Sequence, residues 1–456
     1  MLTTNLRRLD DALPTTNPQQ WLVGYDANEI QALILASSRP LAMLGTSATI
    51  AAFDTRMRNA LTIFAGGGRG VELASNQEAA KARGERLVSE FRDRTFGGVL
   101  ATAAVPFDRD DERGSLRWLH MALERAKDAA PPPVAELATP RSRSDECADC
   151  HMYTAAHPSQ REDQPDERVC RRCLKMVTAG REKQGDLAER IQSLVALGPQ
   201  IAAVSIDGNN LGDFFSSLDS LAAMQTASEA LFELFNSADI EASRHLRHDR
   251  VSLATGGDDL RLFLSAPDLL LYIEALVPAL ERGADELARH PGLRGLAGFG
   301  VGIGAVVADS RLPARRLMAH AHDLERSAKR ICGPGEARSA IDLAVLTAGT
   351  GSIHDPAARD AADRPIAFPR LGPLKTAARR LQDIPGSQRA LLAAAGAGDE
   401  HEFANLLRYQ VARSPQWRAW YTAGGHDWRD PDIVVTERPR AIHFDLARLI
   451  GGSDAV

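Results

Sequence analysis

Two adjacent carboxylates lie at the tip of a predicted hairpin, behind two glycines. In the segment RVSLATGGDDLRLFLSA, two apolar runs flank this tetrad, whose members are Gly256, Gly257, Asp258 and Asp259. A third acid, Asp207, ends the apolar run IAAVSID. If that strand lies beside the hairpin, the three carboxylates converge, and they repel one another strongly unless a cation lies among them. Mg²⁺ or Mn²⁺ prefers oxygen ligands, so these three acids are candidate catalytic residues and metal ligands.

The residues around these acids suit a nucleotide. The two glycines let the backbone approach a triphosphate closely. Asn210, in the turn after Asp207, is a further candidate nucleotide-binding residue. Lys329, near the end of a predicted helix at 313–330, is placed to neutralise phosphate charge. Taken singly, the tetrad is more often a plain turn, Asp207 a helix N-cap and Lys329 an exposed helix residue. Their joint occurrence in this order favours a metal–nucleotide site.

Four of the five cysteines form two CxxC pairs, at Cys147, Cys150, Cys170 and Cys173. In a reducing compartment, two such pairs predict a tetrahedral zinc site rather than disulfides. The polar segment between the pairs cannot build a core of its own, so metal would supply its folding energy. We therefore expect a structural Zn²⁺ in addition to the catalytic Mg²⁺ or Mn²⁺.

The chain contains an internal repeat. Its second half reads strand, helix, hairpin, strand, helix, at 201–215, 250–266, 298–308 and 313–330. Its first half gives the same order, at 21–35, 61–74, 96–107 and 116–128, with Lys127 in register with Lys329. The first copy keeps an acid at Asp26, but its hairpin tip reads Gly66, Gly67, Gly68 and Arg69. The glycines are therefore shared, whereas the paired acids belong to the second copy alone.

This order predicts an α+β fold in which each copy is a ferredoxin-like unit, an antiparallel-rich sheet with helices on one face. The expected domains are a degenerate first unit at 1–130, a linker and zinc-binding segment at 131–180, a second unit with the tetrad at 181–345, and a helical domain at 346–456. The linker is the Pro-rich stretch at 128–144, and the last domain follows from helical periodicity in the C-terminal part.

Composition limits the class of protein. The 456 residues are 44% hydrophobic and 25% charged, with a net charge of −6, which indicates a globular protein without a broad basic DNA-binding surface. The first twenty residues lack the apolar core of a signal peptide, and no apolar run is long enough to span a bilayer. We expect a cytoplasmic protein that does not act at a membrane.

The order Asp207, the GGDD tetrad, then Ala328 and Lys329 resembles the second palm domain of the large, polymerase-like subunit of type III CRISPR effector complexes. It resembles GGDEF-type nucleotide cyclases more distantly. The family also has a degenerate first palm, a zinc-binding segment between the palms and a helical C-terminal domain. The resemblance implies a nucleotidyltransferase that makes cyclic oligoadenylate from ATP as an antiviral second messenger. It also implies RNA and other effector subunits as partners.

This chain departs from the family pattern in two respects. Where the family often carries a second acid two places after the first, this chain has Asn209, so the number of metal ions is open. The larger members of the family begin with an HD nuclease domain, whereas only 20 residues precede the first strand here. We therefore expect a compact relative without that nuclease activity.

Other functions stay open at this point. The palm could hold a nucleotide without turnover, as a silent binding or scaffold subunit of a CRISPR-like ribonucleoprotein, and Asn209 is the feature in favour of that alternative. A GTP-using cyclase is disfavoured because Leu260 follows the tetrad, where that family has an acidic–aromatic pair.

Overall fold

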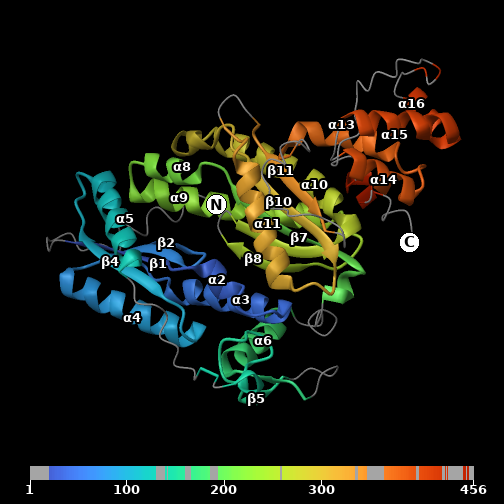
Figure 1. The fold of residues 1–456 in the computed structure, drawn as a ribbon. Coiled ribbons are helices and arrows are strands. Elements are labelled where there is room, and N and C mark those ends of the chain that lie inside the picture. Colours follow the sequence, from blue (N-terminus) through green and yellow to red (C-terminus); the bar gives the residue numbers. More distant parts are fainter. Residues whose placement is uncertain are drawn as a thin grey trace.

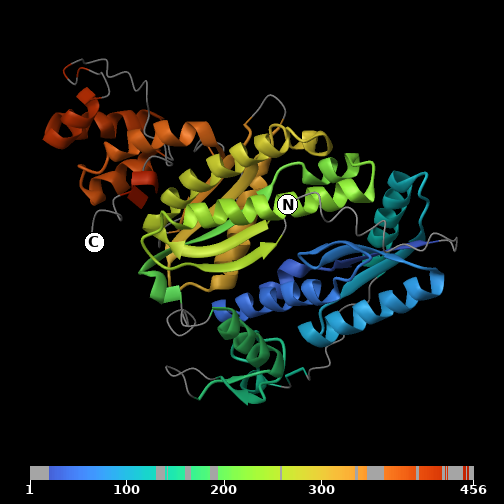
Figure 2. The same ribbon diagram turned by 180° about the vertical axis from the view of Figure 1, so that it is seen from behind.

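The computed structural model describes most of the chain. The described residues are 20–129, 139–159 except 141, 166–184, 194–256, 259–333, 337–346, 364–396 and 400–423, together with 427, 429, 445–447, 449 and 450. Figures 1 and 2 show two sheet-containing units side by side, with the cysteine segment next to the first and a group of helices at the far end of the second.

The first unit is a four-stranded antiparallel sheet in the order β2-β3-β1-β4. Its strands are β1 (Trp21–Ala27), β2 (Thr62–Gly66), β3 (Arg69–Ala74) and β4 (Leu100–Pro106). Its helices are α2 (Ile30–Ile34), α3 (Pro40–Met57), α4 (Gln77–Thr95) and α5 (Glu112–Asp128). Helix α5 covers one face, where Leu119 and Leu123 reach Gly24. Helices α3 and α4 cover the other face and meet through the rings of Phe53 and Phe91.

The second unit is a six-stranded sheet in the order β12-β11-β10-β7-β9-β8, in which only β10 and β11 are parallel. Its strands are β7 (Gln200–Gly208), β8 (Val251–Gly256), β9 (Asp259–Ser265), β10 (Val301–Asp309), β11 (Ala340–Val345) and β12 (Ile366–Ala367). Its helices are α8 (Leu211–Ser217), α9 (Leu221–Ser243), α10 (Leu269–Leu287) and α11 (Ala314–Lys329). A short 3₁₀ turn, η2 (Leu194–Leu197), precedes β7, and two more, η3 (Ala266–Asp268) and η4 (Pro291–Leu296), precede and follow α10.

The internal repeat predicted from the sequence is confirmed. Strands β8-β9-β7-β10 follow the same spatial order as β2-β3-β1-β4, and α11 follows β10 as α5 follows β4. The α+β class with two palm-type units is therefore present in the structure. The expectation of helices on one face is wrong, because helices cover both faces of each sheet. The second sheet is wider than the first because β11 and β12 extend it beyond β10.

Strand alternation decides which side chains of β7 face the site. Because successive residues point to opposite faces, Ala202, Val204 and Ile206 join the apolar core with α9 and α10. Ser205 and Asp207 point to the other face, toward α11. Two glycines of β10 let α11 come close on that face: a Cβ at Gly304 would lie 1.9 Å from the Ala321 carbonyl oxygen, and one at Gly302 would lie 2.4 Å from Lys329 Cγ.

The cysteine segment packs on the first unit. It contains η1 (Arg143–Asp145), β5 (His157–Pro158), β6 (Arg168–Val169) and α6 (Arg171–Gln184). Helices α3 and α6 cross through two glycines, since a Cβ at Gly45 would lie 1.7 Å from the Met176 carbonyl oxygen and one at Gly180 would lie 2.0 Å from the Leu41 carbonyl oxygen. A buried ion pair between Arg39 and Asp149, at 3.4 Å, joins the same two parts.

The C-terminal helices are α13 (Phe368–Arg379), α14 (Gly386–Gly396), α15 (Glu400–Arg413) and α16 (Pro415–Ala423). Phe403 and Trp417 are fully buried among them. An ion pair between Lys375 of α13 and Glu274 of α10 links this group to the second unit. Across the described residues, none of the helices combines the length and the apolar composition that a bilayer crossing requires.

Candidate functional site in the second palm

Strand pairing brings the first acid and the hairpin together. In the register of β7 and β9, Asp207 lies directly opposite Asp259, and Asp259 in turn lies opposite Gly256 of β8. Residues opposite each other on antiparallel strands share a face of the sheet, so both carboxylates lie on the α11 side. The other two members of the tetrad, Gly257 and Asp258, lie outside the described residues.

Lys329 reaches the same place from α11. Its Nζ donates to Asp207 Oδ2 and, at 3.1 Å, to the Gly208 carbonyl oxygen. The side chains of Asp207 and Lys329 are 26% and 28% exposed, so the pair is accessible to a ligand. The last turn of α11 thus places a cation on the candidate metal-binding carboxylate.

A buried acid, Glu325, lies one helical turn before Lys329. It is 1% exposed, and its Oε2 accepts a hydrogen bond from Ser205 Oγ at 2.8 Å and lies 2.9 Å from His322 Nδ1. Its Oε1 is 3.9 Å from Lys329 Nζ. Burial raises the pKa of Glu325, but the hydrogen bond and charge of His322, the Ser205 hydroxyl and the Lys329 ammonium together hold that pKa below its ordinary value.

A buried cation, Arg261, supports the other acid. Its side chain is 4% exposed, and Nη2 donates to Asp259 Oδ2 at 3.2 Å. Arg261 lies opposite Ser205 in the β7–β9 register, so it belongs to the same face. The sequence analysis did not single out Ser205, Arg261, His322 or Glu325. The available signal was a polar residue inside each of two apolar strands, together with the Gly-x-Gly spacing of β10.

The two asparagines after Asp207 have different surroundings. Asn209 is held by the backbone, because its Nδ2 donates to the Arg338 carbonyl oxygen at 3.1 Å and its N–H donates to the Gly300 carbonyl oxygen. Asn210 has a positive φ of 58° and begins α8 without capping it through its side chain. The side-chain amide of Asn209 therefore links the end of β7 to the residues before β11, whereas Asn210 stays a candidate ligand of the nucleotide.

In the first palm, cationic side chains surround the corresponding acid. Asp26 lies opposite Arg69 in the register of β1 and β3, as Asp207 lies opposite Asp259. Asp26 pairs with Arg69 Nε at 3.0 Å and with Lys127 Nζ at 2.5 Å. Two cations thus neutralise this carboxylate, and a divalent ion at the same place would be repelled.

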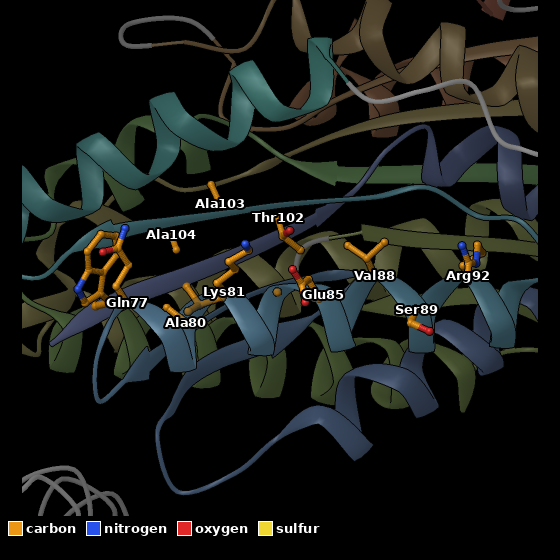
Figure 3. Close-up of a pocket in the computed structure, with 13 residues that line it drawn as sticks. Gln77, Ala80, Lys81, Glu85, Val88, Ser89, Arg92, Thr102, Ala103 and Ala104 are labelled. Atoms are coloured by element: carbon orange, nitrogen blue, oxygen red, sulfur yellow. The ribbon is translucent and has the colours of Figure 1, made fainter.

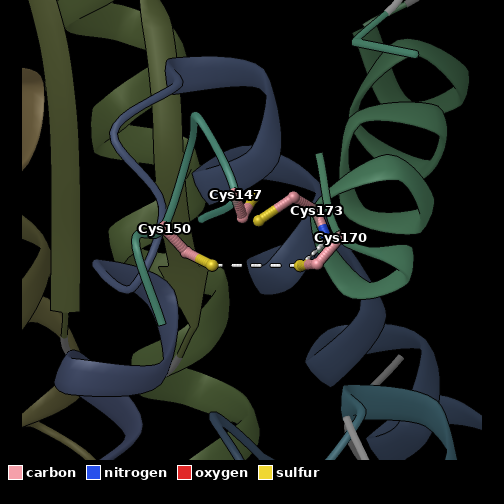
Figure 4. A group of neighbouring side chains, drawn as sticks. All are labelled: Cys147, Cys150, Cys170 and Cys173. Atoms are coloured by element: carbon pink, nitrogen blue, oxygen red, sulfur yellow. Dashed lines mark hydrogen bonds between the residues drawn. The ribbon is translucent and has the colours of Figure 1, made fainter. Parts of the chain in front are cut away.

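The four cysteines meet in one cluster (Figure 4), in which all the Sγ atoms lie within 4.8 Å of one another and all four residues are buried. The Sγ atoms of Cys150 and Cys170 are 3.8 Å apart. Thiolates at about 2.3 Å from a tetrahedral Zn²⁺ lie about 3.8 Å apart, so the donor set fits zinc.

A separate groove of about 540 Å³ runs along α4, on the face of the first sheet opposite to the one that α5 covers (Figure 3). Trp21 and Val23 of β1 and Thr102 of β4 form its floor, and Lys81 and Glu85 of α4 form its wall. None of the predicted site residues lines it, so this groove is not part of the carboxylate site.

Comparison with known proteins supports this description. Residues 200–335 match the family model described as Cas10/Cmr2, second palm domain. No curated protein matches. Among solved structures, a Csm1–Csm4 cassette in complex with cA4 has a TM-score of 0.57 and 14% identity, covering 95% of this chain and 70% of that chain. Csm1 of T. onnurineus has a TM-score of 0.57 and 15% identity, covering 98% of this chain and 71% of that chain.

The Csm1–Csm4 subcomplex of the type III-A CRISPR-Csm interference complex gives a TM-score of 0.58 at 14% identity, covering 98% of this chain and 72% of that chain. The family match falls on β7 to the end of α11, which is the segment that carries Asp207, the tetrad and Lys329. The likeness in fold extends to nearly the whole chain. Residues 200–335 of this chain are therefore similar to a Cas10/Cmr2 second palm domain, and nearly the whole chain shares the fold of Csm1.

Proposed function

We propose that the second palm is a metal-dependent nucleotidyltransferase that joins ATP into cyclic oligoadenylate. The observation that carries this proposal is the pairing of Asp207 with Asp259 beside Lys329, in the palm whose counterpart has Arg69 instead of the second acid. The family match supports the same assignment. Some of the similar solved structures hold nucleotides, namely AMPPNP, pppApA and cA4.

In this proposal each residue of the site has its own role. Asp207, Asp258 and Asp259 would hold Mg²⁺ or Mn²⁺, which would neutralise phosphate charge and lower the pKa of the attacking hydroxyl. Lys329 would leave Asp207 and bind the triphosphate as a point charge. Gly256 and Gly257 leave room for the phosphates, and Asn210 offers an amide to the nucleotide. Arg261, two residues after Asp259 on β9, would orient that carboxylate through its hydrogen bond.

The reaction is the attack of a ribose 3′-hydroxyl of one nucleotide on the α-phosphorus of the next. A P–O bond forms, the bond to pyrophosphate breaks, and the hydroxyl proton goes to solvent. The side chains contribute by positioning and by compensating charge. As for its partners, we propose assembly with other CRISPR effector subunits, because the similar structures include Csm1–Csm4 complexes. The proposal that RNA activates the protein rests on the resemblance of its sequence motifs alone.

The test is mass spectrometry of products formed from ATP with Mg²⁺ or Mn²⁺, with and without cellular RNA. We expect the pair Asp258→Ala and Asp259→Ala to lower product formation by at least about 100-fold, the scale of losing one transition-state charge partner. The matched control is Asp26→Asn in the first palm, which should leave turnover intact. Unchanged turnover in the double variant contradicts the site. Tight ATP binding without pyrophosphate release under any activator assigns the silent binding role instead.

A further inference from the structure

The buried acid Glu325 is not required to pack α11 on the sheet. In the first palm, the residue four places before Lys127 is Leu123, and it packs against Gly24, the counterpart of Ser205. The same helix–strand contact is therefore built there from an apolar pair. The second palm instead buries a carboxylate with a serine and a histidine, although burial disfavours a charge.

Lys329 lies between two carboxylates. On the strand side its ammonium contacts Asp207 and the Gly208 carbonyl oxygen, and on the helix side it lies 3.9 Å from Glu325 Oε1. In the first palm, Lys127 also contacts Asp26, but its acidic neighbour on the helix is Glu124, which is 52% exposed. A buried second carboxylate next to the lysine is thus a feature of the palm that carries the paired acids.

Metal binding would compete with this lysine. A divalent cation bound to Asp207 cannot share that carboxylate oxygen with an ammonium, because the two cations repel each other. The ammonium must then move away from Asp207. Glu325 is on the same helix as Lys329 and is fixed by Ser205 and His322, so it stays beside the lysine after the movement.

We propose that Glu325 is a positioning residue which remains the counter-ion of Lys329 and so lets a divalent cation displace that ammonium from Asp207. The inference rests on the proposed function, since it assumes that the carboxylates bind metal. Without the Glu325 charge, Lys329 stays paired with Asp207. The metal must then compete with a tighter Lys329–Asp207 ion pair. The concentration of metal that the site requires should therefore rise when the Glu325 carboxylate is lost.

The test uses the full chain and Mn²⁺ alone, with free Mn²⁺ measured by electron paramagnetic resonance, alongside the Mn²⁺ dependence of product formation. In Glu325→Gln, which keeps the shape of the side chain, we expect the Mn²⁺ dissociation constant to rise at least about threefold, the scale of one partly exposed ion pair. The matched control, Glu124→Gln in the first palm, should leave it unchanged. In a Lys329→Ala background, Glu325→Gln should shift it by less than about twofold, because the effect acts through the lysine.

An unchanged Mn²⁺ constant in a folded Glu325→Gln variant overturns the inference, and so does an equal shift with and without Lys329. If that variant does not fold, the pair Ser205→Gly and Glu325→Leu reproduces the packing of the first palm and should show the same rise. A shifted Mn²⁺ constant in a protein that makes no product leaves the inference standing and removes the proposed function. Product formation with an unshifted Mn²⁺ constant supports the proposed function and overturns the inference about Glu325.

Discussion

At the scale of single residues, the two palms differ in how each treats the acid that ends its first strand. Asp26 is held by Arg69 and Lys127, whereas Asp207 faces Asp259 and contacts Lys329. We therefore expect this one-residue difference in charge opposite the first acid to decide whether the site attracts or repels a divalent cation.

Another residue of the first palm, Asp54 of α3, holds its hairpin in place. Its Oδ2 accepts the Gly68 N–H at 2.9 Å, and its Oδ1 accepts the Tyr25 hydroxyl at 3.1 Å. Gly68 has a positive φ of 80°, which explains the glycine at this position of the turn. Burial raises the pKa of Asp54 from its ordinary value of 3.8 to about 6, although the two hydrogen bonds oppose this rise.

This raised pKa predicts a pH-dependent stability. An acid whose pKa is higher in the folded state binds protons more tightly there, so its ionisation lowers stability as the pH rises from about 4 to about 6. Between pH 4 and pH 7, the unfolding free energy of Asp54→Asn should rise by up to about 3 kcal/mol relative to that of the parent chain, because the pKa of Asp54 differs by roughly two units between the folded and unfolded states. Urea unfolding of both proteins across this range measures the difference. A difference that does not vary with pH contradicts the assignment.

At the scale of elements, glycines set how closely helices approach their neighbours. Gly302 and Gly304 bring α11 onto β10, so that Glu325 and Lys329 reach across to β7. Gly45 and Gly180 do the same for α3 and α6, and they fix the cysteine segment to the first palm.

The α3–α6 crossing should therefore be intolerant of a methyl group. In Gly45→Ala, the new Cβ would lie 1.7 Å from the Met176 carbonyl oxygen, so backbone must move. We expect a loss of about 1–3 kcal/mol of unfolding free energy, typical of overpacking. Gly212→Ala in α8 is the matched control, because nothing lies within 4 Å of its added Cβ. It should gain up to about 1 kcal/mol from helix propensity. Equal effects in thermal or urea unfolding argue against the crossing as described.

At the scale of the whole molecule, the two palms pack on each other reciprocally. Helix α3 of the first palm contacts β8 of the second, and α9 of the second palm contacts β2 of the first. The first contact places Ile50 and Phe53 in one core with Leu253, and the second places Leu221 with Ile63. The outer strand of each hairpin, β8 or β2, is thus supported by a helix of the other palm. Because α3 also holds α6, the cysteine cluster connects through one helix to the strand that leads into the tetrad.

Removal of metal from the cysteine cluster should therefore lower the local stability of elements outside the cluster. We expect one zinc per chain by mass spectrometry of the metal, and loss of it in the pair Cys170→Ser and Cys173→Ser. Hydrogen exchange should then increase in α6, in α3 and in β8, because they pack in series. Helices α14–α16 serve as the internal control and should exchange as before. Faster exchange confined to residues 142–184 would show that the cluster stabilises only its own segment.

The sequence by itself determined the types and order of the chemical groups. The repeat, the acids at 207 and 259, the lysines at 127 and 329 and the two CxxC pairs could all be read from spacing, since strands and helices have fixed periods. Only the tertiary structure decided which groups touch. The face shared by Ser205, Arg261 and Glu325 depends on the register of β7 with β9 and on how closely α11 approaches β10. Residues 120 positions apart meet there because of packing, and no local pattern encodes that distance.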